Sequence, residues 1–361
     1  MLVFRDEAKI DIKYPLKKLG DPEKILYFDI ETTGLSRQYC FIYLIGCLYI
    51  EDGTPKYVQW MAENKNDEGN VLMAFEKFLA GFDTLIHFNG DSFDIPFVRE
   101  RGAKMNIKFD FERMKSIDIF KSLGDMRNLL HLENRKQKTY EKLIGIDRKD
   151  KFNGGQLIEV YHEFVRTKDA KLAMALLLHN VEDVINMGSL TSLLAISDMF
   201  KGKFQINDYS FNEYEGFDGS NACELKVQID LENELPIDIA YDDKMITLRA
   251  SGTSAELSVK AKITTLKIFY SNYKEYYYLP DEDKAIHKSV AQFVDRDYRK
   301  QATASTCYEC REDIYFPIED IELFDHTFRK EYSTKQHYVR KEDINDDNIR
   351  YYVISIFQLC L

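Results

Sequence analysis

Two acidic residues stand at the end of an apolar run near the N-terminus. Asp29 and Glu31 belong to the run from Ile25 to Gly34, which begins with strand-forming residues and ends in turn residues. Because side chains alternate along a strand, residues i and i+2 share a face, and we expect both carboxylates to point the same way. Two like charges at the rim of a core repel each other unless a cation lies between them. The pair indicates a cation site; a strand that merely ends in acidic turn residues is the alternative.

A third carboxylate stands where another predicted strand gives way to a helix. Thr84 to Phe88 is predicted as a short strand, Asn89 and Gly90 as a turn, and a helix is expected to begin near Asp94. Asp94 would then lie at the edge of the same sheet as the first pair. Asp is also a common N-cap residue, so capping is the alternative.

A histidine and a fourth carboxylate lie in the longest periodic segment of the chain. His179 and Asp183 are four residues apart within Asp169 to Phe200, so on the predicted helix they share one face. A simple surface pair is the alternative. Four carboxylates at one place favour Mg²⁺ or Mn²⁺, the cations that hard oxygen ligands suit. Two such ions about 4 Å apart hold a phosphodiester, activate a water and stabilise the leaving oxyanion.

The elements that must position these residues alternate between strands and helices. Strands are predicted over 25–34, 40–50 and 56–61, and their short connections indicate an antiparallel meander. Further strands are expected over 84–88 and 116–120, and helices over 67–82, from Asp94 onward, and over 140–144, 156–165 and 169–200. This order predicts an α/β fold in which helices flank a mixed sheet.

The texture of the chain changes after Phe200. Residues 204–240 are acidic and are predicted to be irregular, and short strands follow between 245 and 270. A helix is predicted over 281–302, and the tail over 314–361 mixes short strands with a final helix or strand. Residues 1–23 are predicted as a polar lead-in. We therefore expect one domain over 1–203 and a smaller β or α+β domain of unknown role over 204–361.

Composition narrows the class of protein. The chain has 45% hydrophobic and 30% charged residues, as is typical of soluble globular proteins. No apolar run reaches the roughly 18 residues that a membrane span needs, and Met1 to Lys13 lacks the apolar core of a signal peptide. The six scattered cysteines indicate a reducing setting without a disulfide framework. We expect a cytoplasmic protein that does not bind membranes.

Charge is distributed unevenly. The formal net charge is −12, whereas a protein that coats nucleic acid generically would be basic. The segment from Arg99 to Lys151 contains fifteen Lys and Arg residues but only nine Asp and Glu residues. An ordinary solvated surface is the preferred interpretation of this excess, and a basic approach to an acidic centre is the alternative.

The ordered motifs resemble those of the DEDD exonucleases of the ribonuclease H-like superfamily. Asp29-x-Glu31 matches their first motif, Asn89-x-x-x-x-Asp94 the second and His179-x-x-x-Asp183 the third. The chain is most similar to bacterial predicted exonucleases related to the proofreading domain of family B DNA polymerases. Leu143 to Arg148 also resembles a stretch of that group, and the resemblance covers about residues 24–197.

The resemblance implies a metal-dependent 3′–5′ exonuclease that acts on single-stranded or frayed 3′ ends of nucleic acid. Asp29, Glu31, Asp94 and Asp183 would hold two Mg²⁺ or Mn²⁺ ions. Thr32, Thr33, Gly34 and Leu35 would cradle the terminal nucleotide, and Asn89 and Phe93 would shape its pocket. A ribonuclease H-like module that binds nucleic acid without cutting it, and an endonuclease or resolvase on the same fold, are the alternatives. The sequence favours neither DNA nor RNA, and it does not say which proteins, if any, bind this chain.

The third motif departs from the family in one respect. Family members with a catalytic histidine place it five residues before the last aspartate, and those with tyrosine place it four before. His179 stands at the four-residue spacing, which turns a helical side chain by about 100°. We expect His179 to act as general base or to orient the attacking water.

Two further signals are weaker. Asp118, at the end of the strand over 116–120, is either an outer carboxylate of the site or an ordinary strand-end residue. Cys307-x-x-Cys310 lacks the second half of a zinc site, so we expect it to be structural or incidental.

Overall fold

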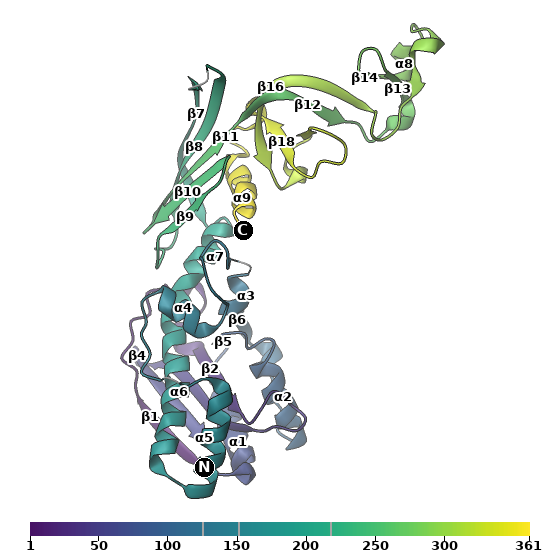
Figure 1. The fold of residues 1–361 in the computed structure, drawn as a ribbon. Coiled ribbons are helices and arrows are strands. Elements are labelled where there is room, and N and C mark those ends of the chain that lie inside the picture. Colours follow the sequence, from purple (N-terminus) through teal and green to yellow (C-terminus); the bar gives the residue numbers. More distant parts are fainter. Residues whose placement is uncertain (125, 151, 217–218) are drawn as a thin grey trace. The chain divides into compact units, whose positions relative to one another are not determined.

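The computed structural model describes residues 1–361 except 125, 151 and 217–218. These residues form two compact units (Figure 1). One unit contains Met1–Ser197 and Asn233–Ile237, and the other contains Asp198–Glu232 and Asp238–Leu361. The expected division of domains between 203 and 204 stays a prediction, because these units are defined by contacts and not by independent folding.

A six-stranded mixed sheet forms the centre of the N-terminal unit. Its strands, in spatial order, are β1 (Leu2–Glu7), β4 (Thr54–Met61), β3 (Ile42–Glu51), β2 (Ile25–Thr32), β5 (Thr84–His87) and β6 (Lys115–Asp118). The strands from β1 to β2 pair in antiparallel fashion, and β5 and β6 run parallel to β2. The prediction of a polar lead-in over residues 1–23 was wrong for Leu2–Glu7, which form strand β1. Most of its residues are exposed at the sheet edge, so it lacks the apolar alternation that would predict a strand.

Seven helices of the described residues follow or interrupt these strands. They are α1 (Glu68–Leu79), α2 (Asp94–Lys104), α3 (Ile119–Ser122), α4 (Gln137–Leu143), α5 (Gly154–Thr167), α6 (Ala170–Leu190) and α7 (Leu194–Phe200). The predicted helices over 67–82, 156–165 and 169–200 match α1, α5 and the succession of α6 and α7.

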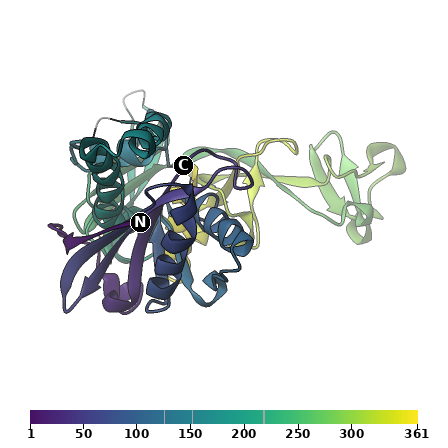
Figure 2. The same cartoon turned by 90° about the horizontal axis from the view of Figure 1, so that it is seen from below.

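The alternation of side chains along β2 determines which helices cover which face of the sheet. Phe28 turns to one face, where its ring stacks on Phe75 of α1 with 5.5 Å between the centroids. Asp29 turns to the opposite face and meets Asn180 of α6. Figure 2 shows the teal helices and the blue helices on different sides of the purple strands. The predicted mixed sheet flanked by helices is therefore confirmed.

A glycine allows α6 to approach the sheet closely. Gly46 of β3 pairs with Asp29 of β2 and lies beneath Asn180. A Cβ atom at Gly46 would come within 2.0 Å of the Asn180 Oδ1 atom. The missing side chain thus lets a polar residue of α6 reach the carboxylate on β2.

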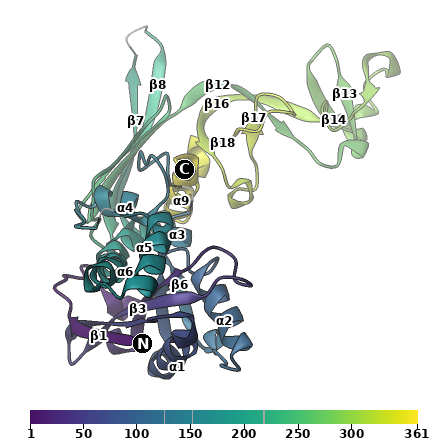
Figure 3. The same ribbon diagram turned by 60° about the horizontal axis from the view of Figure 1, so that its bottom comes forward.

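The C-terminal unit is built mainly from antiparallel strands. A five-stranded sheet has the order β7 (Phe204–Glu215), β8 (Asn221–Leu231), β11 (Ser254–Lys260), β10 (Ile246–Ser251) and β9 (Ile239–Asp242). A closed four-stranded barrel contains β12 (Lys262–Phe269), β16 (Tyr308–Ile318), β18 (His337–Arg340) and β17 (Phe328–Arg329). Figure 3 shows β12 and β16 side by side along their length. A small sheet of β14 (Lys284–His287), β13 (Tyr276–Leu279) and β15 (Lys300–Gln301), with helices α8 (Lys288–Ala291) and α9 (Ile349–Leu359), completes the unit.

Two predictions for this unit were wrong. Residues 204–240 are not irregular but contain β7, β8 and the start of β9. Every second residue from Cys223 to Leu231 is buried, a strand pattern that the acidic composition of the segment obscures. Residues 281–302 are not one helix, because two of their segments pair as strands with β13 and only α8 is α-helical. Such pairing between distant segments overrides local helical preference.

No helix among the described residues combines the length and the apolar character that a bilayer span needs. All six cysteines are free thiols. Neither Cys307 nor Cys310 belongs to a described group of three or more possible metal ligands. That this pair is structural or incidental stays a prediction.

Candidate active site

One strand and the start of one helix bring three of the predicted carboxylates together. Asp29 and Glu31 lie on β2, and Asp94 is the first residue of α2. The Asp94 Oδ1 atom accepts a hydrogen bond of 3.2 Å from the Ile30 backbone N–H, between the other two. The N-cap of α2 is Phe93, and no side chain caps this helix. Asp94 therefore does not cap its helix but faces β2.

Helix α6 supplies the remaining predicted residues. His179 and Asp183 lie one turn apart on it, with 3.2 Å between His179 Nε2 and Asp183 Oδ2. The same Nε2 atom lies 3.5 Å from Glu31 Oε1 on β2. One ligand atom from each of these three residues lies within 4.8 Å of the others, so together they could hold a metal ion.

Asn180 ties α6 to the first carboxylate. Its Nδ2 atom donates to Asp29 Oδ2 at 3.0 Å, and its Oδ1 atom accepts from Gln59 Nε2 at 2.9 Å. Gln59 also donates to the Leu177 carbonyl, and both Gln59 and Asn180 are buried. This chain of hydrogen bonds fixes the distance between the helix and β2.

The carboxylates destabilise one another in their ionised forms. Burial, and then the charges of Asp183 and Asp94, raise the pKa values of Asp29 and Glu31 well above their usual range. Burial also raises the pKa of Asp94 to about 7, although the Ile30 N–H opposes this shift. A bound cation would offset both the desolvation and the repulsion. The donor set, mostly carboxylate oxygens with one imidazole nitrogen, suits a divalent metal ion.

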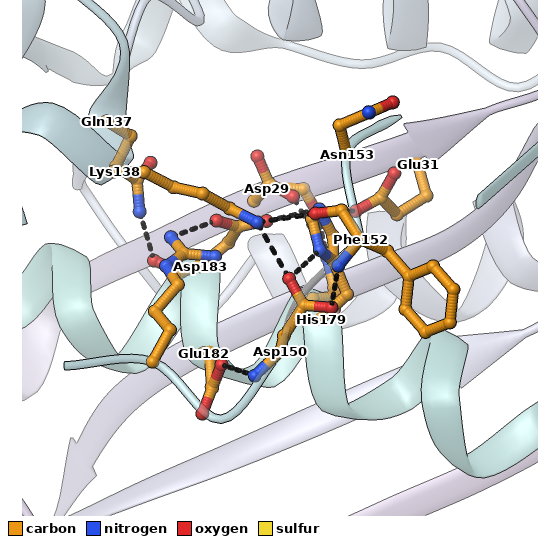
Figure 4. A network of polar contacts seen from close by, with 12 residues as sticks. Asp29, Glu31, Gln137, Lys138, Asp150, Phe152, Asn153, His179, Glu182 and Asp183 are labelled. Carbon is orange, nitrogen blue, oxygen red and sulfur yellow. Dashed lines mark hydrogen bonds and ion pairs between the residues drawn. The ribbon is translucent and has the colours of Figure 1, made fainter. Parts of the chain in front are cut away.

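A buried carboxylate orients the imidazole of His179. The Asp150 Oδ2 atom lies 2.6 Å from His179 Nδ1 and accepts a second hydrogen bond of 2.8 Å from Lys138 Nζ (Figure 4). The Phe152 backbone N–H donates to the other oxygen at 2.9 Å. Burial raises the pKa of the Asp150 carboxyl, but the hydrogen bonds from Lys138, Phe152 and His179 outweigh it, and the net pKa is lowered. Asp150 therefore remains charged beside the imidazole.

An arginine neutralises part of the charge of the last carboxylate. The Arg148 Nη2 atom lies 2.5 Å from Asp183 Oδ1 and 2.5 Å from Glu141 Oε1. Arg148 Nε also pairs with the second oxygen of Glu141. Gln137 of α4 donates to the Asp183 carbonyl at 2.9 Å, so α4 and the loop that follows it hold this turn of α6 in place.

The predicted nucleotide-binding residues lie in two loops. Thr32 ends β2, and its hydroxyl donates to the Gly34 carbonyl at 2.8 Å. Gly34 has a φ of +152°, and a Cβ atom there would meet Cys40 Sγ at 2.7 Å, so this turn requires glycine. The Thr33 backbone bonds to Phe41 across the loop, which leaves Leu35 85% exposed at its tip.

The second loop joins β5 to α2. Asn89 adopts a left-handed backbone, with a φ of +64°. Phe93 is half-buried, with its ring 5.4 Å from that of Phe97, and it immediately precedes Asp94. Asn89 lies further from Asp94 along the chain, and its backbone N–H donates to Asp118 rather than to a residue of the carboxylate group.

Asp118 anchors this second loop. Its oxygens accept hydrogen bonds from the backbone N–H groups of Asn89 (2.8 Å), Asp91 (3.3 Å) and Lys121 (3.3 Å). Buried His87 lies beside it, with Nδ1 accepting from the Gly90 N–H at 3.0 Å. Asp118 therefore acts as a strand-end residue that supports the loop leading to Asp94.

Sequence reasoning missed three residues that the fold places at the site. Asn180 lies between the predicted His179 and Asp183, yet nothing in the sequence distinguishes it from an ordinary helical residue. Arg148 ends the stretch from Leu143 that already resembles the exonuclease group, which was the one available signal. Asp150 stands in a mixed-charge segment, and only the tertiary fold brings it to the imidazole.

Comparison with known proteins relates the N-terminal part of the chain to one superfamily. The sequence profile of the RNase H superfamily matches residues 26–195. A DNA polymerase from Pyrococcus glycovorans is 32% identical over 117 residues, which are 30% of this chain and 15% of the polymerase. The chain thus spans a small part of that relative's length.

Two solved structures are also similar to part of the chain. The family B DNA polymerase from Pyrobaculum calidifontis aligns with a TM-score of 0.39 and 16% identity, over 50% of this chain and 26% of that one. The E. coli ExoI–ssDNA complex in its zinc-bound form aligns with a TM-score of 0.29 and 12% identity, over 57% of this chain and 54% of that one. The match to the superfamily profile, rather than these scores, carries the comparison. Residues 26–195 of the chain match the RNase H superfamily, which the ordered acidic motifs predicted.

Proposed function

We propose that the chain is a metal-dependent 3′–5′ exonuclease that hydrolyses phosphodiester bonds at nucleic-acid ends. One observation carries the proposal: β2, α2 and α6 bring four carboxylates to one place, where the pKa values of three of them are raised. A protein gains nothing in stability from such repulsion. A site that binds divalent cations explains why the charges are kept together.

The four carboxylates would hold two Mg²⁺ or Mn²⁺ ions. Asp29, Glu31, Asp94 and Asp183 supply oxygen atoms, which these ions prefer. Bound ions of this kind activate a water and stabilise charge on the scissile phosphate and the leaving oxygen. Asn180 and the Ile30 N–H hold Asp29 and Asp94 in place. His179, with its Nε2 atom directed at Glu31 and Asp183, either accepts a proton from the attacking water or binds metal itself.

Substrate binding is proposed for the two loops beside the carboxylates. The exposed Leu35 side chain offers an apolar surface for the terminal base, and the ring of Phe93 lies next to Asp94. Aromatic and apolar faces stack with bases without regard to sequence, which suits an enzyme that trims ends. We propose single-stranded or frayed 3′ ends as substrate. The free cysteines support the proposal of a reducing, cytoplasmic setting.

The proposal is tested with oligonucleotides labelled at the 5′ end. Incubation with Mn²⁺ or Mg²⁺ should give a ladder that shortens from the 3′ end with release of mononucleotides, and EDTA should abolish it. Asp29→Asn removes one charge of the acidic set without changing its size, and should lower the rate at least about a hundredfold. Internal fragments would indicate an endonuclease instead. Binding without cleavage in either metal would indicate a non-catalytic module.

A matched control separates the site from general damage. Asp169 caps α6, far along the helix from Asp183, and its side chain accepts from the Lys171 N–H. Asp169→Asn keeps a residue that caps helices well, so its rate should stay near that of the unaltered protein. Equal activity of the Asp29→Asn protein would overturn the proposal.

A further inference from the structure

We propose that His179 is a direct ligand of a bound metal ion through Nε2, rather than a general base, and that Asp150 is its positioning residue. The inference rests on the metal site of the proposed function and adds to it a nitrogen ligand. It also assigns a chemical preference: a site with one imidazole among its carboxylates should bind Mn²⁺ in preference to Mg²⁺.

The first argument is the tautomer of the imidazole. Asp150 accepts at 2.6 Å from Nδ1, and a charged carboxylate can only accept. When the imidazole carries one proton, that proton must therefore sit on Nδ1, which leaves a lone pair on Nε2. Metal-binding histidines commonly donate their other ring N–H to a carboxylate in this way.

The second argument is the rigidity of Asp150. Besides His179, its side chain accepts from Lys138 Nζ and from the Phe152 backbone N–H. Its own backbone N–H donates at 3.0 Å to Glu182, which lies on α6 within one turn of His179. Asp150 is thus held to the same helix as the imidazole that it orients. The imidazole cannot turn its Nε2 atom away without breaking the hydrogen bond between His179 Nδ1 and Asp150.

The third argument is distance. Nε2 lies 3.2 Å from Asp183 Oδ2 and 3.5 Å from Glu31 Oε1. Two neighbouring ligand atoms on one octahedral ion, each about 2.1 Å from it, lie roughly 3 Å apart. Nε2 is therefore spaced from each of these two oxygens much as ligands of a common ion are, and one ligand atom from each of the three residues lies within 4.8 Å of the others.

The four-residue spacing fits this role. Residues i and i+4 of a helix present their side chains to one point, as two metal ligands on a helix do. Both His179 and Asp183 turn toward Glu31, and the His179 side chain is only 8% exposed. A deeply placed imidazole between two carboxylates is poorly placed to exchange protons with solvent.

The test measures how the protein binds Mn²⁺. Pulsed EPR detects hyperfine coupling between Mn²⁺ and the nitrogen of a directly bound imidazole. The full-length protein loaded with Mn²⁺ should show this coupling, and His179→Gln should lose it. His162→Gln, which alters an exposed histidine on α5, is the matched control and should retain the coupling. An imidazole that only pairs with carboxylates gives no coupling in any of these proteins.

Affinities provide a second readout that a purely structural role would not move. His179→Gln should weaken binding of Mn²⁺ by about tenfold or more while changing the affinity for Mg²⁺ less, so that the preference between the ions shrinks. Asp150→Asn leaves the ligand present but disturbs its anchor, and should weaken Mn²⁺ binding by about tenfold. A change shared equally by both ions would overturn ligation by His179, as would an unchanged Mn²⁺ affinity.

Failure of this inference is distinguishable from failure of the proposed function. A protein that trims 3′ ends with Mn²⁺ but shows no nitrogen coupling counts against His179 as a ligand and not against the exonuclease. A protein that shows the coupling but degrades no oligonucleotide counts against the exonuclease alone. If His179→Gln does not fold, the coupling in the unaltered protein and the Asp150→Asn affinities still decide the matter.

Discussion

The Arg148 guanidinium lies 2.5 Å from Asp183 Oδ1 and is itself held by buried Glu141. A positively charged side chain thus already pairs with Asp183, one of the proposed metal ligands. The Arg148 and Glu141 side chains are only 6% and 1% exposed, so each charge is compensated mainly by the other rather than by water. Removing one partner leaves the other uncompensated in a medium of low polarity.

We therefore expect Arg148→Met to destabilise the protein by about 3 kcal/mol or more, measured by urea denaturation. Adding Glu141→Gln should recover part of this loss, because the Glu141 carboxylate then no longer lies buried without its cationic partner. The exposed pair of Arg166 and Glu163 on α5 provides the control, and Arg166→Met should leave stability unchanged within error. Equal effects of the two arginine substitutions would contradict the assigned role of Arg148.

The raised pKa of Asp94 predicts a dependence of stability on pH. Burial raises this pKa to about 7 in the folded protein, against about 4 in an unfolded chain. Between these values the folded state holds more protons than the unfolded state, so the contribution of Asp94 to stability falls as pH rises through the window. Metal-free protein in EDTA should lose melting temperature from pH 5 to pH 8.

Metal should reverse this trend. Added Mn²⁺ should raise the melting temperature at pH 8 more than at pH 5, because the ionised carboxylates bind it best. The Asp94→Asn protein in EDTA should show a shallower decline with pH and a higher melting temperature at pH 8. A decline that is just as steep in this variant would mean that other groups cause it.

Gly46 predicts a steric effect on the site. Gly46→Ala would place a Cβ atom 2.0 Å from Asn180 Oδ1, so the Asn180 side chain or α6 must shift. We expect a loss of roughly 1–3 kcal/mol of stability and a loss of metal affinity, since either shift disturbs the hydrogen bond from Asn180 to Asp29. Gly154→Ala, at the start of α5 with nothing within 4 Å, is the matched control. Its stability and Mn²⁺ affinity should not fall.

Substitution of Leu35 should weaken substrate binding without lowering the stability of the protein. The side chain is 85% exposed, so Leu35→Ala should change stability by no more than about 0.5 kcal/mol. Loss of its contact with the terminal base should raise KM for a short oligonucleotide by roughly tenfold, with kcat less affected. Met174→Ala, which alters a 70% exposed residue of α6, should change neither quantity. An unchanged KM in the Leu35 variant would remove this residue from the substrate site.

Local patterns were sufficient for most of the N-terminal unit. The apolar run before Asp29 and the helical spacing of apolar residues in α1 and α6 can be recognised in each segment alone. Burial of one face selects apolar residues at the period of the helix or strand. Edge strand β1 and the paired segments around β13 carry no such period. Their structure depends on hydrogen bonds to segments far away in the chain, which a local window does not contain.

The sequence by itself determined the acidic set and its order. Asp29 and Glu31 share a face because strands alternate, and His179 and Asp183 share a face because a helix repeats after about 3.6 residues. Only the tertiary structure decided how the imidazole of His179 is oriented. Asp150 lies 29 residues before His179, in a segment with no period of its own, and meets it through folding alone. That one contact directs Nε2 toward Glu31 and Asp183, because a hydrogen bond at one ring nitrogen fixes where the other points.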